Sequence, residues 1–164
     1  MVVLDRVTST TVLTDSAAET TMYTYSVPAN MGAKLGEVLD LEMILSFQNF
    51  SLADRTYTAR VKFGGTTHFT EALPAMASSG LLRPVVIRVR IQNTGASSQY
   101  IIATASVGVN GNDWSVAPLL APAHVIVAGT IDQTAAQTLA VSIQSDAATA
   151  TQVVTTRVAL LTLT

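Results

Sequence analysis

The sequence predicts an all-β protein of about eight strands, a sandwich or a barrel and not a parallel α/β fold. Three observations carry this prediction. Apolar and polar residues alternate with a period of two in several separate stretches, which is typical of strands with one buried face. Turn-forming residues separate these stretches at short intervals. No stretch of useful length has apolar residues at helical spacing, so a chain of 164 residues is expected to form one β domain with a substantial core.

The clearest strand pair lies between residues 56 and 70. Its first half alternates strictly, with apolar side chains at every second position and Thr58, Arg60 and Lys62 between them. Gly64 and Gly65 then interrupt the pattern, and a second strand-like run follows, which predicts a hairpin. The expected inward residues of the first strand are Tyr57, Ala59, Val61 and Phe63.

The longest alternation spans residues 38–47, where acidic side chains at Asp40 and Glu42 point outward. Its expected inward residues are Leu39, Leu41, Met43, Leu45 and Phe47. Residues 20–27 are expected to place Tyr23, Tyr25 and Val27 on one face. The remaining expected strands are 85–92, 99–109, 124–131, 137–144 and 151–163, and residues 72–80 and 117–123 are expected to be loops.

Residues 1–19 differ from the expected domain at 20–164. Two short apolar stretches, Val2–Leu4 and Val12–Leu13, are separated by threonine and serine. One interpretation is an edge strand of the domain, and the other is an extended arm whose free backbone groups add to a sheet of a neighbour. Both stay open. On either interpretation, the candidate residues for contact with another subunit or a larger assembly are Val2, Val3, Leu4, Val12, Leu13 and Trp114.

Charge is scarce in this chain. Charged residues make up 12%, against about 25% in ordinary soluble domains, and the net charge is −2. An oligomer that shares part of its surface explains this better than a neutral-surfaced monomer, which is the alternative. Basic residues are dispersed, so no nucleic-acid partner is expected. No apolar run reaches membrane-spanning length, the first residues do not resemble a signal peptide, and the absence of cysteine excludes disulfides and thiolate metal sites.

No motif predicts catalysis or a cofactor. His68 and His124 lack acidic neighbours at metal-ligand spacing, so both are interpreted as ordinary polar residues. Asp40 and Glu42 form a carboxylate pair on one face, but cross-strand ion pairs with Arg60, Lys62, Arg88 or Arg90 are the simpler interpretation. Trp114 follows a Gly- and Asn-rich stretch at 108–113. That stretch is interpreted as a hairpin turn instead of a calcium or sugar site, and the tryptophan as a cap on a core or interface.

Several segments resemble a domain found in structural proteins of tailed bacteriophages. These segments are YTYSVPAN at 23–30, NFSLADRTYTARVKFGGTT at 49–67, DQTAAQTLAVSIQ at 132–144 and ALL at 159–161. The similarity extends over residues 20–164. Its motifs consist of strand and turn residues, so they indicate a structural family and not an activity.

The resemblance implies a single antiparallel, jelly-roll-like β-sandwich, in a family that is often trimeric and includes head decoration proteins, head fibres and tail appendages. Because this chain has no coiled-coil or repeated shaft, we expect a decoration or cement protein. Such a homotrimer would bind the major capsid protein, or another virion protein, on the outer capsid surface. A receptor- or glycan-binding fibre domain, with Tyr100 or Trp114 at its site, is the alternative. A glycan-active enzyme is the least favoured reading.

Overall fold

The computed structural model describes residues 1–8, 11–31, 34–78, 80–95, 97–108, 125–148 and 152–164. These described residues contain eleven strands and no helix. The strands are β1 (Val2–Val7), β2 (Val12–Thr14), β3 (Thr20–Val27), β4 (Val38–Asn49), β5 (Tyr57–Phe63), β6 (Thr66–Ala72), β7 (Arg83–Gly95), β8 (Ser98–Val107), β9 (Val125–Gly129), β10 (Gln137–Ser145) and β11 (Gln152–Leu163).

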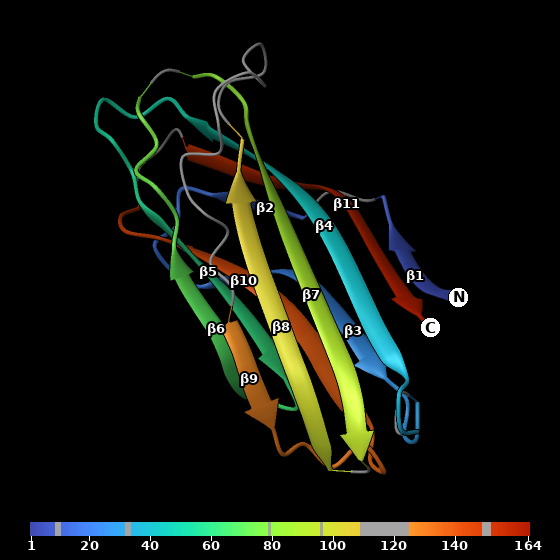
Figure 1. Ribbon diagram of the computed structural model, residues 1–164. Helices are drawn as coiled ribbons and strands as arrows, with labels where there is room; N and C mark the ends of the chain where they lie inside the picture. Colours follow the sequence, from blue (N-terminus) through green and yellow to red (C-terminus); the bar gives the residue numbers. More distant parts are fainter. Residues whose placement is uncertain (9–10, 32–33, 79, 96, 109–124, 149–151) are drawn as a thin grey trace.

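The strands form two antiparallel sheets that pack face to face (Figure 1). The large sheet has the order β1-β11-β4-β7-β8-β9, with β2 also pairing with β11, and the small sheet has the order β3-β10-β5-β6. The predicted all-β antiparallel sandwich is therefore confirmed.

The strand order is that of a jelly roll. β1 and β2 both pair with β11, at opposite ends of it, and so act as one interrupted strand. If β1 and β2 are counted as one strand and β8 and β9 are left out, eight strands remain, which can be numbered one to eight along the chain. In that numbering the large sheet (β1-β11-β4-β7) has the order 1-8-3-6, and the small sheet (β3-β10-β5-β6) has the order 2-7-4-5. Eleven strands appear instead of about eight because the first strand is interrupted and because β8 and β9 widen the large sheet.

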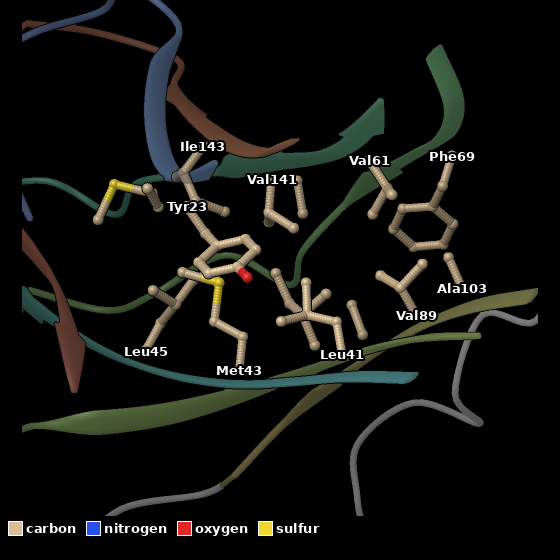
Figure 2. Packing of buried hydrophobic residues seen from close by; sticks show 14 of the residues in the cluster. Tyr23, Leu41, Met43, Leu45, Val61, Phe69, Val89, Ala103, Val141 and Ile143 are labelled. Carbon is tan, nitrogen blue, oxygen red and sulfur yellow. The ribbon is translucent and has the colours of Figure 1, made fainter. Parts of the chain in front are cut away.

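The core lies between the sheets, where side chains from both inner faces interdigitate (Figure 2). The predicted inward residues of β4 and β5 are all buried, with exposures of 2% or less, because strict alternation assigns every second side chain to the same face. The same alternation on β7 buries Val85, Ile87, Val89 and Ile91 to the same extent. Phe47 and Tyr57, one from each sheet, pack edge to face with ring centroids 4.9 Å apart. Such aromatic contacts add to the burial of the two rings themselves.

One buried residue of β3 was not predicted. Tyr23 and Val27 are buried as predicted and Tyr25 packs against the core while partly exposed, but Met22, next to Tyr23, is buried as well. The register with β10 shifts between Val141 and Ser142, so adjacent residues of β3 both face inward at this point. A bulge of this kind depends on the partner strand, and alternation within one strand does not reveal it.

The predicted turn between β5 and β6 is confirmed. Gly64 and Gly65 have φ angles of +58° and +77°, in the left-handed region that glycine occupies without steric cost. Gly64 also lies against the β9–β10 connection, where an added Cβ would come within 2.6 Å of Ile131 Cγ2. The first glycine is therefore required both for the conformation of the turn and for packing.

Candidate interaction surfaces

The described residues show no assembled metal centre. No group of three or more His, Asp or Glu side chains within them is placed to hold a metal ion. His68 lies on β6 with its Nε2 3.2 Å from the carbonyl oxygen of Phe63, beside a depression of about 410 Å³ between the edge strands β6 and β9. His124 lies outside the described residues. Within the part of the chain that is described, no helix is long and apolar enough to cross a membrane.

The two outward acids of β4 are paired with arginines of β7. Arg90 donates from Nε to Asp40 Oδ1 at 2.7 Å and from Nη2 to Asp40 Oδ2 at 3.2 Å, and Arg88 donates from Nε to Glu42 Oε2 at 2.8 Å. The bidentate contact with Asp40 raises the pKa of Arg90 above its ordinary value. Both pairs are cross-strand neighbours in the register of β4 and β7, which confirms the ion-pair interpretation.

These four side chains lie in a shallow depression on the outer face of the large sheet. The depression has a volume of about 560 Å³. It extends over β11, β4, β7 and β8, and its other outward-facing lining residues are Ile102, Thr104, Ser106, Leu160 and Thr162. We call this surface, with its two acids, two arginines and aliphatic flanks, the charged face.

A second surface lies at the end of the sandwich where β4 ends and β7 begins. Four large apolar side chains of the β4–β5 and β6–β7 connections are exposed there, and we call them the apolar tip: Phe50, Leu52, Leu81 and Leu82. Their exposed fractions are 52%, 103%, 50% and 44%. Scattered single apolar residues are common on protein surfaces, but four of them on two adjacent connections form a candidate docking site.

The connections that carry the tip are held by a buried amide. Asn49 is 3% exposed, and its Nδ2 donates to the carbonyl oxygens of Ala53 at 3.0 Å and Met76 at 2.9 Å. Its Oδ1 accepts from the backbone N–H of Ser51 at 3.0 Å, and its own carbonyl accepts from Gly80 N at 3.0 Å. These hydrogen bonds tie the β4–β5 connection to the β6–β7 connection and so link the two segments that carry the apolar tip.

The N-terminal candidates divide into exposed and buried residues. Val2, Val3 and Val12 are 59%, 55% and 46% exposed along the outer edge of the large sheet. Leu4 packs against the core and Leu13 is 1% exposed within it. These residues lie on β1 and β2, whose free edge is available to another strand. Trp114 and the expected loop at 117–123 lie outside the described residues.

The edge strand is also tied to the small sheet. Tyr23 Oη donates to Asp5 Oδ2 at 3.1 Å, a contact between β3 and β1. Burial, reinforced by the nearby Asp5 charge, raises the pKa of Tyr23 well above its usual range. The tyrosine therefore stays protonated and keeps this donor at any ordinary pH.

A small ionic cluster lies on the outer face of the small sheet. Glu19, just before β3, accepts hydrogen bonds from Lys62 Nζ and from Ser142 Oγ, and lies 3.6 Å from Arg60 Nη1. The hydrogen bonds from Lys62 and then from Ser142 lower the pKa of Glu19. Arg60 also donates to Gln144 Oε1 at 2.8 Å, so this cluster connects the segment just before β3 to β10 and β5.

Comparison with known proteins gives few matches. No protein-family model and no curated protein matches the chain. The fold is similar to the CBM2 module of the evolved Dit protein of Lactobacillus casei BL23 phage J-1, with 7% identity, a TM-score of 0.39, and coverage of 84% of this chain and 66% of that chain. It is also similar to the structure of infectious bursal disease virus Gt strain, with 15% identity, a TM-score of 0.37, and coverage of 97% and 30%. The chain thus spans only part of either protein, and at TM-scores this low neither likeness carries an argument about function.

The apolar tip is the surface that the sequence analysis missed. Residues 49–54 fell between two expected strands, and Leu81 and Leu82 fell between an expected loop and an expected strand. The signal was present in the sequence, since Phe50 and Leu52 are large apolar residues inside a turn-rich segment. Apolar residues at turn positions lack an inward face to occupy and are therefore candidates for contact with a partner.

Proposed function

We propose that this chain is a structural virion protein that decorates a bacteriophage capsid as a homotrimer and stabilises it from the outer surface. Three features support the proposal: the phage-like strand and turn motifs, the jelly-roll order of the strands, and a surface that is poor in charge but carries exposed apolar groups. The partner would be the major capsid protein or another virion protein. We propose no catalytic function.

The apolar tip carries the proposal. Its side chains stand on connections held by the buried Asn49, so docking orders little additional chain. If a capsid covered about 300 Å² of apolar surface at the tip, the transfer would favour binding by about 7.5 kcal/mol before the entropic costs of association. One such contact gives weak binding by itself. In a trimer the second and third contacts form at high effective concentration, which makes the attachment firm.

The tip can be tested by placing charge on it. We expect Leu52→Asp combined with Leu81→Asp to abolish co-sedimentation with expanded heads that lack the protein, because both side chains would carry charge into the contact. The thermal transition should stay close to that of the wild-type protein, since Leu52 is fully exposed and Leu81 half exposed. Thr24→Asp, at an exposed position on the small sheet, is the matched control. Full occupancy by the double variant would rule out the tip as the docking site.

The exposed N-terminal residues are proposed as a second contact. Deletion of residues 1–19 is not a clean test, because it would remove β1 and β2, the buried Leu13 and the hydrogen bond between Asp5 and Tyr23. Val2→Lys with Val3→Lys leaves the core intact and blocks pairing at this edge with positive charge. Loss of decoration or of the trimer would support the contact, whereas unchanged decoration and mass would exclude it.

A glycan-binding role is the second candidate, and Tyr100 is the observation that favours it. This tyrosine is 49% exposed on the outer face of β8, and its cross-strand neighbours are Gln92 and Ala128. An exposed ring beside an amide is suited to stacking against a sugar and bonding its hydroxyls. A glycan array that gives a signal lost in Tyr100→Ala would favour this role. A blank array together with labelling on heads and none on tails would exclude it.

A further inference from the structure

We propose that the charged face binds the charged face of a second copy of this chain across a two-fold axis. The two arginines and two carboxylates are concentrated there although the chain has only nine basic and eleven acidic residues in all. Asp40 and Glu42 are two apart on β4, and Arg88 and Arg90 occupy the directly opposite positions on β7. One negative stripe therefore runs beside one positive stripe.

Two adjacent stripes of opposite charge are self-complementary under one particular symmetry. A two-fold axis parallel to the strands, running between β4 and β7, places β4 of one copy over β7 of the other. Each acidic stripe then faces a basic stripe, and the same operation sets β11 over β8. Such a contact is isologous and closes on itself, as most homo-oligomeric contacts do.

The paired side chains keep unused bonding capacity. Within the described residues, Arg88 donates only from Nε, and Arg90 leaves Nη1 without a partner. A guanidinium has five N–H donors, and a carboxylate accepts about four hydrogen bonds. Side-chain exposures of 67% for Arg88 and 50% for Glu42 leave both groups accessible. Facing copies would extend each pair into a network of alternating charges, which is stronger than an isolated exposed pair.

The surroundings of the stripes suit burial. The other outward positions of β4, β7 and β8 near the stripes are uncharged, and several are aliphatic: Val38, Ile44, Ser46, Val86, Gln92, Ile102, Thr104 and Ser106. On β11, the exposed Arg157 donates from Nε to Ser46 Oγ at 2.8 Å, so one further guanidinium borders this flank. Under the two-fold axis Ile44 of one copy contacts Val86 of the other. Val158 on β11, which is 38% exposed, lies over β8 of the other copy. Apolar contacts thus flank the ionic centre.

The area suits a reversible contact. Four strands about 4.8 Å apart span about 19 Å, and the outward residues from Val38 to Ser46 span about 27 Å, which gives about 500 Å² from each copy. The total of about 1,000 Å² is at the lower limit of specific interfaces. Association should therefore depend on protein concentration and weaken as salt is added. On a capsid, where copies are held close together, such a contact would link neighbouring decoration proteins.

Charge reversal with complementation tests the proposal on the full chain. Arg88→Glu with Arg90→Glu makes both stripes acidic, and Asp40→Arg with Glu42→Arg makes both basic. We expect sedimentation velocity to show self-association of the wild-type protein and none through this face in either variant. An equimolar mixture should restore a species of two chains, twice 17.2 kDa, because an acidic face then meets a basic one. If the protein is already trimeric, the expected change is from six copies to three, with the mixture restoring six.

Two further variants keep the test informative if the charge-reversed proteins fail to fold. Val86→Glu places a carboxylate against the partner's apolar flank without reversing any ion pair, so it should dissociate the contact even if the reversed proteins fail to fold. Thr24→Glu, at an exposed position on the outer face of the small sheet, is the matched control and should leave the association unchanged. The proposal is overturned if the wild-type mass never exceeds one chain, or three for a trimer. It is also overturned if folded reversed variants do not complement, or if Val86→Glu self-associates like the wild-type protein.

Discussion

The core packing makes a quantitative prediction at Val61. This side chain is 0% exposed at the centre of β5, and its register partners are Val141 on β10 and Phe69 on β6, both buried. Val61→Ala removes two methyl groups, which costs about 1.6 kcal/mol in transfer free energy, and the residual cavity brings the loss to about 2–3 kcal/mol. Val61→Asp loses the burial of the side chain and also places an unpaired carboxylate between the sheets.

The aspartate variant should lose most of the stability of the domain. An uncompensated buried charge costs about 3–5 kcal/mol, and the lost valine adds about 2 kcal/mol, against a total of about 5–15 kcal/mol for domains in general. Arg60→Ala is the neighbouring control. Its side chain lies on the outer face, and removing its contacts with Gln144 and Glu19 should cost at most about 1 kcal/mol. Urea denaturation followed by circular dichroism measures all three. A Val61→Asp protein that unfolds like the wild type would refute the inward assignment of β5.

Three further perturbations have expected outcomes. Gly64→Ala should lower the free energy of unfolding by about 1–3 kcal/mol, since it adds strain at positive φ and a clash with Ile131, and thermal melts measure the loss. Because the pKa of Glu19 is lowered in the folded state, its ionised carboxylate contributes stability that is lost as the pH falls through that pKa. Glu19→Gln should therefore reduce the loss of stability on acidification. Burial raises the pKa of Tyr57 to about 12. The stability that the protonated phenol contributes is therefore fully present below pH 10 and is lost as the pH rises from about 10 to 12. Tyr57→Phe should therefore reduce the alkaline loss of stability, and a denaturation series across that range would contradict us if the two proteins lost stability equally.

Local features of the fold could be predicted from the sequence because they depend on neighbours along the chain. Residues 39–47 alternate without interruption, so the buried face of β4 followed from the period alone. The turn at Gly64 and Gly65 followed from residue type. The Met22–Tyr23 bulge could not be predicted, because it arises from the register that β10 imposes on β3. Pairing of β1 and β2 with β11 joins the two ends of the chain, and no local pattern encodes it.

The candidate surfaces could likewise be predicted from the sequence only in part. Outward acids on β4 and outward arginines on β7 could be predicted separately, but four basic residues were equally suitable partners for Asp40 and Glu42. Arg60 and Lys62 prove to lie on the other sheet, and only the strand order selects Arg88 and Arg90. The apolar tip needed the structure, because two connections far apart in sequence meet at one end of the sandwich.

The central claim is that this charge-poor sandwich works by contact with copies of itself and with a capsid. We would incubate the purified protein with bacteriophage heads that lack a decoration protein and image the particles by cryo-electron microscopy. We expect density for clustered copies on the outer head surface, with the end that bears Leu52 and Leu81 against the capsid. Bare heads, with all of the protein left in solution as single chains, would refute the proposal.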